Sequence, residues 1–162
     1  MDRKQIAVRL TIDALGLPFA MNTFDERLVL QKAVYLGQAA GVKLGYYFSW
    51  YLRGPYCSPL AADAFCVAEE LTQDTDDWHR WKLDEESNKR LNEVKDLVDL
   101  HGDLEKAAWL ELLASIHFLL KTKQASADDS AGLAETLKRY GKDYESSEVR
   151  RAVSALRRKS LL

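Results

Sequence analysis

The stretch from residue 25 to residue 71 constrains the fold of this chain more than any other part. It runs from an apolar segment through the aromatic run YYFSWYL and a Gly-Pro pair into a second apolar segment, and it holds five of the seven tyrosines. Apolar residues at helical spacing, a short aromatic run and a Gly-Pro pair are typical of a helix, a strand and a turn. The stretch therefore predicts helix, strand, turn and helix in that order, with the rest of the chain packed around them.

The first predicted helix of this stretch covers about residues 25–40. Its apolar side chains go nearly all the way round, which is typical of a helix buried at the centre of a domain. Thr23 or Asn22 is the predicted N-cap, because short polar side chains accept the free N–H groups of a first helical turn. Gly41 is the predicted stop.

Polar residues interrupt this apolar helix along one stripe. Gln31, Tyr35 and Gln38 follow one another at helical spacing, and Lys32 lies beside them. Packing does not explain these side chains. We expect the following strand to bring the turn at residues 53–56 close to the stripe.

Residues 46–52 form the predicted strand, because aromatic residues favour strands. The Gly-Pro pair at residues 54–55 predicts a turn after it. Ser58 followed by Pro59 predicts a helix that runs to about Leu71, with Ser58 as the N-cap. Alternation places one set of strand residues on each face: Tyr47, Ser49 and Tyr51 against Tyr46, Phe48, Trp50 and Leu52.

A second short strand is predicted at residues 78–83, where side-chain character alternates, and it is expected to pair with residues 46–52 because a lone strand is unstable. Further helices are expected at residues 2–15, 87–100, 104–120, 130–140 and 147–161, the third starting after Asp103 as cap and the last after Ser146 or Ser147. We predict a single domain over residues 1–162 and a mainly α fold. This is a compact helical domain with a short two-stranded antiparallel ribbon, an arrangement compatible with a winged helix.

The amino-acid composition indicates the cellular compartment in which we expect this chain. The 162 residues are 47% hydrophobic, enough for a core, but no apolar run reaches the length of a membrane span. The N-terminus lacks the apolar region of a signal peptide. Two cysteines cannot form the disulfide framework of a domain this size, so we expect a reduced cytoplasm and no membrane association.

Charge is unevenly distributed along the chain, although the net charge is only -2. Residues 63–111 carry fifteen Asp and Glu against six Lys and Arg, whereas residues 138–162 carry three against eight. Such segments pair with each other or present two faces to different partners.

Residues that bind metals or attack substrates form no recognisable motif. The histidines and cysteines lie far apart, without CxxC or HxxxH spacing: His79, His101, His117, Cys57 and Cys66. The acidic run at residues 74–77 starts like a calcium loop but lacks the Gly and Glu that follow in one. Cys57 has no histidine near it in the sequence to act as a base. We expect no metal, no cofactor and no enzymatic activity; an enzyme would need a site assembled from distant residues.

DNA binding is one hypothesis for function. A helical domain with a ribbon suits a winged helix, and the basic tail offers phosphate contacts through Arg150, Arg151, Arg157, Arg158 and Lys159. The charged residues of the predicted helix at residues 58–71 are all acids, whereas a helix that reads bases needs exposed Arg, Asn, Gln or Lys. The basic tail can equally neutralise the acidic middle.

A protein-binding surface is the leading hypothesis. Tyr, Trp and Arg are enriched in interface hot spots, and six of them crowd a short stretch: Tyr46, Tyr47, Trp50, Tyr51, Arg53 and Tyr56. The alternative for each residue is burial against a neighbouring helix. The acidic middle of the chain could also dock a basic partner.

The order of these motifs resembles the YwgA-type bacterial proteins and the wider Panacea (SocA-like antitoxin) superfamily. Those proteins show a helix of the type LQKLVYL, an aromatic strand ending in a Y-x-x-GPYS-like turn, and a helix start. Ala33 stands where that family commonly has Leu, and Cys57 where it commonly has Ser. The matching residues, within a stretch of about forty, are Leu30, Gln31, Lys32, Val34, Tyr35, Leu36, Phe48, Trp50, Tyr51, Gly54, Pro55, Tyr56, Leu60 and Asp63.

The resemblance implies a compact, mostly helical bacterial or phage protein that acts by binding protein. Members look like antitoxins or accessory proteins that neutralise a toxin or deliver it to a protease, and some occur beside defence genes. For this chain we expect a toxin, a protease adaptor target or a defence component as partner, with a homo-oligomer as a further option. The predicted contact residues are Gln31, Lys32, Tyr35, Trp50, Arg53 and Tyr56.

Overall fold

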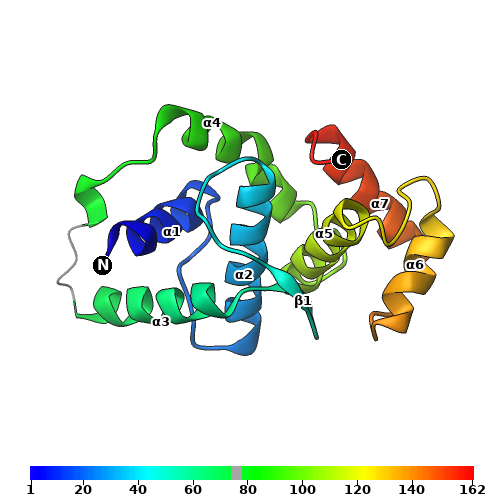
Figure 1. The fold of residues 1–162 in the computed structure, drawn as a ribbon, viewed down its shortest axis with the longest axis horizontal. Coiled ribbons are helices and arrows are strands. Elements are labelled where there is room, and N and C mark those ends of the chain that lie inside the picture. Colours follow the sequence, from blue (N-terminus) through cyan, green and yellow to red (C-terminus); the bar gives the residue numbers. More distant parts are fainter. Residues whose placement is uncertain (74–77) are drawn as a thin grey trace.

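The computed structural model describes residues 1–73 and 78–162. These residues form seven α-helices, two short 3-10 helices and one antiparallel hairpin (Figure 1). The mainly helical fold with a two-stranded ribbon is therefore confirmed. The helices are α1 Arg3–Ala14, α2 Phe24–Ala39, α3 Ser58–Thr72, α4 Glu85–Val94, α5 Lys106–Lys121, α6 Ser130–Arg139 and α7 Ser146–Arg158.

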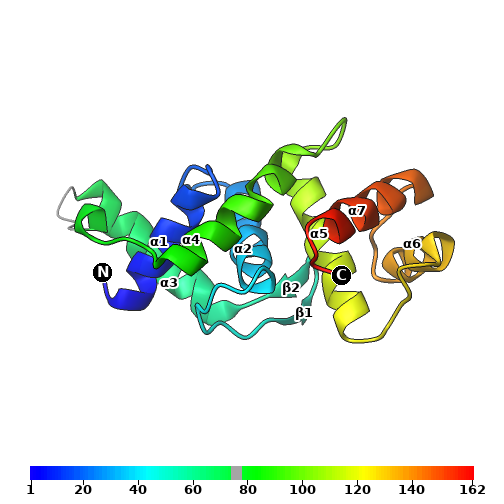
Figure 2. The same cartoon turned by 90° about the horizontal axis from the view of Figure 1, so that it is seen from above.

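Helices α2 and α5 pack against each other at the middle of the molecule. Helices α1, α3 and α4 lie on one side of this pair, while α6 and α7 lie on the other (Figures 1 and 2). The N-terminus is at the α1–α3 end, and the C-terminus lies beside α7 near the opposite end. The hairpin contacts α2 and α5 and so lies over the junction of the two halves.

Burial explains the central position of these two helices. Nearly all of α5 is buried, from Ala107 to Leu119, and α2 is buried from Leu28 to Gly37 except at Val29 and Tyr35. Each fully buried large aliphatic side chain contributes about 1.5–3 kcal/mol relative to exposure. The all-round apolar pattern of α2 and α5 is therefore what drives them into the core.

The hairpin consists of β1 Ser49–Tyr51 and β2 Gly54–Tyr56, with Trp50 opposite Pro55. The prediction of a strand at residues 78–83 is wrong: its start is the 3-10 helix η1, Trp78–Arg80, and the ribbon's second strand comes from the predicted turn. Gly54 makes this local return feasible because its φ of +81° suits a tight turn. Closing a short loop also costs less entropy than pairing distant segments.

Helix starts follow the predicted cap chemistry at some sites and not at others. Thr23 caps α2 and forms a capping box with Glu26, as its position predicted. Ser58 is not a cap, because the helix already includes it and Cys57 occupies the N-cap without a side-chain hydrogen bond. Pro59 fixes the first turn there instead.

Three other predicted boundaries shift. The caps of α5 and α7 are glutamates, Glu105 and Glu145, and not Asp103 or the serines at residues 146–147. The expected helix at residues 87–100 ends earlier, and its second half is the 3-10 helix η2, Lys95–Asp99. No helix of the described residues is long and apolar enough to cross a membrane. The acidic run at residues 74–77 lies outside the described residues.

Candidate functional site

Side chains of α2 hold the start of α3 and the second strand of the hairpin by their backbones. The Gln31 amide donates to the Cys57 carbonyl oxygen at 2.9 Å and accepts from the Cys57 N–H at 3.1 Å. The next residue of α2, Lys32, donates through Nζ to the Pro55 carbonyl oxygen at 2.7 Å. The predicted approach of this stripe to the turn region is confirmed for these two residues.

Gln38 repeats the same arrangement two turns further along α2. Its amide donates to the Tyr46 carbonyl oxygen at 2.8 Å and accepts from the Tyr46 N–H at 2.9 Å. These paired amide bonds satisfy the backbone groups of Tyr46, which precedes β1, and of Cys57, which follows β2. Helix α2 thus fixes the chain on both sides of the ribbon.

A pocket opens between α2, α3 and the tip of the hairpin. It encloses about 360 Å³, within the size range of ligand and side-chain pockets. Four apolar or aromatic side chains around it are more than half exposed: Phe24 at 53%, Phe65 at 52%, Tyr51 at 59% and Leu52 at 75%. The other lining residues are Met21, Arg27, Leu28, Leu30, Gln31, Lys32, Arg53, Tyr56 and Ala61.

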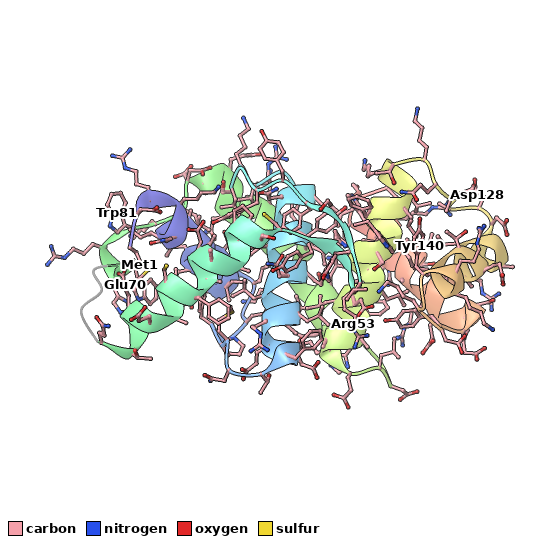
Figure 3. The ribbon with its side chains drawn as sticks, turned by 60° about the horizontal axis from the view of Figure 1, so that its bottom comes forward. Met1, Arg53, Glu70, Trp81, Asp128 and Tyr140 are labelled. Carbon is pink, nitrogen blue, oxygen red and sulfur yellow. The ribbon has the colours of Figure 1, made fainter. Side chains whose placement is uncertain are left out.

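A group of four charged side chains lies under the hairpin beside this pocket. We call Lys32, Arg53, Glu111 and Lys142 the hairpin cluster. Lys142 Nζ donates to Glu111 Oε1 and, at 3.3 Å, to the Leu52 carbonyl oxygen. Arg53 reaches the other oxygen of Glu111 at 3.4 Å from the exposed tip of the hairpin (Figure 3). The cluster therefore contains three basic groups around one carboxylate.

Burial makes Lys32 the most perturbed member of the cluster. Its side chain is 1% exposed, and desolvation lowers its pKa from 10.5 to about 7. The Glu111 carboxylate raises this pKa, while the positive charges of Lys142 and Arg53 lower it further. A single carboxylate thus does not compensate the amine for burial next to two other cations.

Tyr35 of α2 and Trp50 of β1 do not line the pocket. Tyr35 Oη is 2.8 Å from His117 Nδ1, and its ring packs edge-on against Phe48 with centroids 5.1 Å apart. Burial raises the pKa of Tyr35, and it lowers that of His117 to about 4, with a smaller effect of Lys121. Trp50 packs against Tyr140, with ring centroids 4.6 Å apart and the ring planes tilted by 49°. Both residues tie the strand to α5 and the C-terminal half.

The six predicted contact residues therefore occupy different environments. Arg53 is exposed and Tyr56 half-buried, and both line the pocket, as the buried Gln31 and Lys32 also do. The strand alternation is right for Tyr47, which is 93% exposed, and for the buried Tyr46, but Leu52 points outward because it lies in the turn.

Four side chains of the candidate site were not predicted from the sequence. Phe24 and Phe65 belong to none of the motifs discussed above, whereas both border the pocket. Glu111 carried a usable signal, because a buried glutamate interrupts an otherwise apolar helix. Lys142 carried none, since it follows α6 in a polar segment and meets its partner 31 positions away in the sequence.

The basic tail is largely engaged within the molecule. Arg151 donates to the His101 carbonyl oxygen at 2.8 Å and stacks over Trp109. Lys159 pairs with Asp96 of the acidic middle at 2.6 Å, and Arg157 with Asp128 at 2.5 Å. Helix α2, which precedes the hairpin, is buried and presents no long exposed face to a DNA groove.

Within residues 1–73 and 78–162, no three His, Cys, Asp or Glu residues gather as metal ligands would. Cys57 is buried at the start of α3, and Cys66 is exposed on the same helix. The chain matches no family model, no curated protein and no solved structure with significance.

Proposed function

We propose that this protein is a non-enzymatic protein-interaction module, antitoxin-like or an accessory of a bacterial or phage defence system. The observation that carries the proposal is the pocket between α2, α3 and the hairpin, with its exposed aromatic and apolar border. Contiguous exposed apolar surface around a concave site marks an interaction site in soluble proteins. The resemblance to SocA-like antitoxins supplies the class of partner, and five of its matching residues line the pocket: Leu30, Gln31, Lys32, Tyr51 and Tyr56.

The composition of the pocket suits a protein partner. Arg53 and the tyrosines at positions 51 and 56 are of the residue types that dominate binding energy in interfaces. Below them, Gln31 and Lys32 hold the backbone of the hairpin and the start of α3. A rigid base under aromatic side chains limits the entropy lost on binding.

Filling the pocket tests the proposal. Ala61 lines the pocket from α3, whereas its neighbour Ala62 is exposed and does not line it. We expect that Ala61→Trp no longer co-purifies with the product of a neighbouring gene. We also expect that this variant no longer protects cells against the toxicity of that product. Ala62→Trp, the matched control, should retain both.

Two further measurements keep this test decisive. Circular dichroism and thermal unfolding check that Ala61→Trp folds. If it does not fold, Phe65→Glu is used in its place, because it disrupts the border of the pocket at an exposed position. Arg53→Ala combined with Tyr56→Ala should have the same effect as filling. Full binding and protection by the folded pocket variants would refute the proposal.

A further inference from the structure

The charged side chains that line the pocket are all basic, which indicates what kind of segment it accepts. Its charged lining residues are Arg27, Lys32 and Arg53, and no Asp or Glu is among the described residues that line it. The surrounding walls are aromatic and aliphatic. A site of this composition attracts a group that is both apolar and negatively charged.

Both arginines of the pocket are held in place with donors to spare. Arg27 uses one terminal nitrogen on the Met21 and Asn22 carbonyl oxygens at 3.0 and 3.1 Å. Arg53 uses one terminal nitrogen on Glu111, and its guanidinium lies 5.6 Å from the Phe24 ring centroid. A guanidinium has five N–H donors in a fixed plane, so both arginines retain donors for a carboxylate.

The charge balance behind the pocket favours an incoming anion. Glu111 is the acidic member of the hairpin cluster. Both Arg53 and the buried Lys142 contact it. Asp25 and Glu26 in the first turn of α2 do not line the pocket, and Glu26 accepts from the Thr23 N–H. The cluster keeps more positive than negative charge, which a second carboxylate at Arg53 would offset.

We infer that the pocket takes a segment of a protein partner in which a large apolar side chain lies beside an Asp or Glu side chain. The apolar side chain fills the pocket between Leu28, Ala61 and Phe65, and the carboxylate meets Arg53 at the tip of the hairpin. This inference rests on the proposed function and adds the chemistry of the partner.

A protein segment fits this surface better than a free small molecule does. The exposed side chains of Phe24, Tyr51 and Leu52 surround the opening and offer contact area on the outside of the molecule. A small ligand sealed inside the pocket would leave this border unused. A chain that crosses the pocket covers the border on both sides of the inserted side chain.

Selection of random peptides tests the inference without knowledge of the partner. The peptides are displayed with a free N-terminus and are joined to the carrier at the C-terminus, so that their carboxylates are all on side chains. Peptides that bind the full chain are kept, and those that also bind Ala61→Trp are removed. We expect the recovered sequences to share a Leu, Phe or Trp within two positions of an Asp or Glu.

The recovered peptide is then synthesised with acetylated and amidated ends and titrated by fluorescence anisotropy. Replacing its acid by the matching amide, or Arg53→Gln in the protein, should weaken binding about tenfold, the loss expected for one charge-assisted hydrogen bond. Arg158→Gln, at an exposed position on α7 outside the pocket, is the charge-matched control and should leave binding unchanged.

The outcomes separate this inference from the proposed function. Peptides without an acid, or peptides that bind Arg53→Gln as well as wild type, overturn the inferred chemistry and leave the docking pocket standing. The inference also fails if no peptide distinguishes wild type from both Ala61→Trp and Phe65→Glu, or if 4-phenylbutyrate binds more tightly than any peptide. Loss of the neighbouring gene product on Ala61→Trp, measured separately, decides the proposed function.

Discussion

Gly54 shows at the scale of one residue why the hairpin turns where it does. Its φ is +81°, and a Cβ on it would lie 2.3 Å from Ser115 Oγ on α5. Glycine is therefore required twice, once by the backbone and once by the close approach of the helix. The Gly-Pro pair was correctly read as a break in the aromatic run, but its role as the start of β2 depends on a helix far along the chain.

We predict that Gly54→Ala destabilises the protein by about 1–3 kcal/mol for backbone strain, with a steric contribution in addition. Gly45→Ala is the matched control, because Gly45 has a φ of +74° with open space around it. Urea unfolding of both variants isolates the contact with Ser115. Adding Ser115→Ala should recover part of the loss in Gly54→Ala, and no recovery would mean that the clash is not the cause.

Lys32 makes stability depend on pH at the same scale. The folded-state pKa is lowered from 10.5 to about 7 by burial, with Glu111 opposing and Lys142 and Arg53 reinforcing the shift. Between these two values the unfolded chain holds the proton and the folded chain does not. The free energy of unfolding therefore rises with pH across this window.

Lys32→Met removes this titration while filling a similar volume. We predict that the free energy of unfolding of wild type rises relative to that of Lys32→Met from pH 7 to pH 10. Below pH 6 the difference between the two should stay constant. Guanidinium unfolding across this range measures it, and the subtraction cancels other groups. A flat difference throughout would show that Lys32 keeps its ordinary pKa in the folded protein.

At the scale of elements, α2 fixes the chain before and after the ribbon through glutamine side chains. Gln31 and Gln38 each donate to a carbonyl oxygen and accept from the N–H of the same residue. An amide is suited to this because it combines a donor and an acceptor. With both flanks fixed and Lys32 bonded to Pro55 of β2, a ribbon of two three-residue strands is held in place.

We predict that Gln31→Glu destabilises the protein by about 1–3 kcal/mol, because the carboxylate cannot donate to the Cys57 carbonyl oxygen and is buried. Gln38→Glu makes the same change at a half-buried position, so its loss should be smaller. Thermal unfolding ranks the two variants; in both, the carboxylate still accepts from the backbone N–H, so the loss reports the missing donor. Equal stability of Gln31→Glu and wild type would contradict this role.

Elements with local signals were predictable from the sequence, and those that depend on distant contacts were not. Thr23 and the apolar pattern after it determine where α2 begins. The strand at residues 78–83 was wrong because alternation there has no partner, while Gly54 gives the ribbon a nearer one. The polar stripe of α2 was visible, but its backbone acceptors were not, since every residue carries the same carbonyl.

The whole molecule is joined across its middle by the hairpin cluster. Lys142 follows α6, Glu111 lies on α5, and both reach the turn of the hairpin through Leu52 and Arg53. Lys142 also lies 5.8 Å from the ring centroid of Trp50. The C-terminal half therefore holds the hairpin from one side while α2 holds it from the other, and the pocket depends on both.

Breaking the buried pair should loosen this connection. Glu111 and Lys142 side chains are each 3% exposed, and removing one partner of such a pair typically costs about 3–5 kcal/mol. We predict a loss of this size for Glu111→Gln, because Lys142 and Arg53 then lack their carboxylate. Asp143→Asn is the control nearby: its pair with Lys138 is exposed on both sides, so the change should cost less than about 1 kcal/mol.

The double variant Glu111→Gln with Lys142→Met shows whether the loss comes from uncompensated charge or from lost packing. If charge is the cause, the double variant is more stable than the sum of the single losses predicts, since removing the second charge relieves the first. Guanidinium unfolding gives the three free energies, and binding of the peptide selected on the pocket reports whether the tip of the hairpin has moved. Additive losses would show that the two side chains stabilise the hairpin independently, and that the cluster does not join the halves of the molecule through its charges.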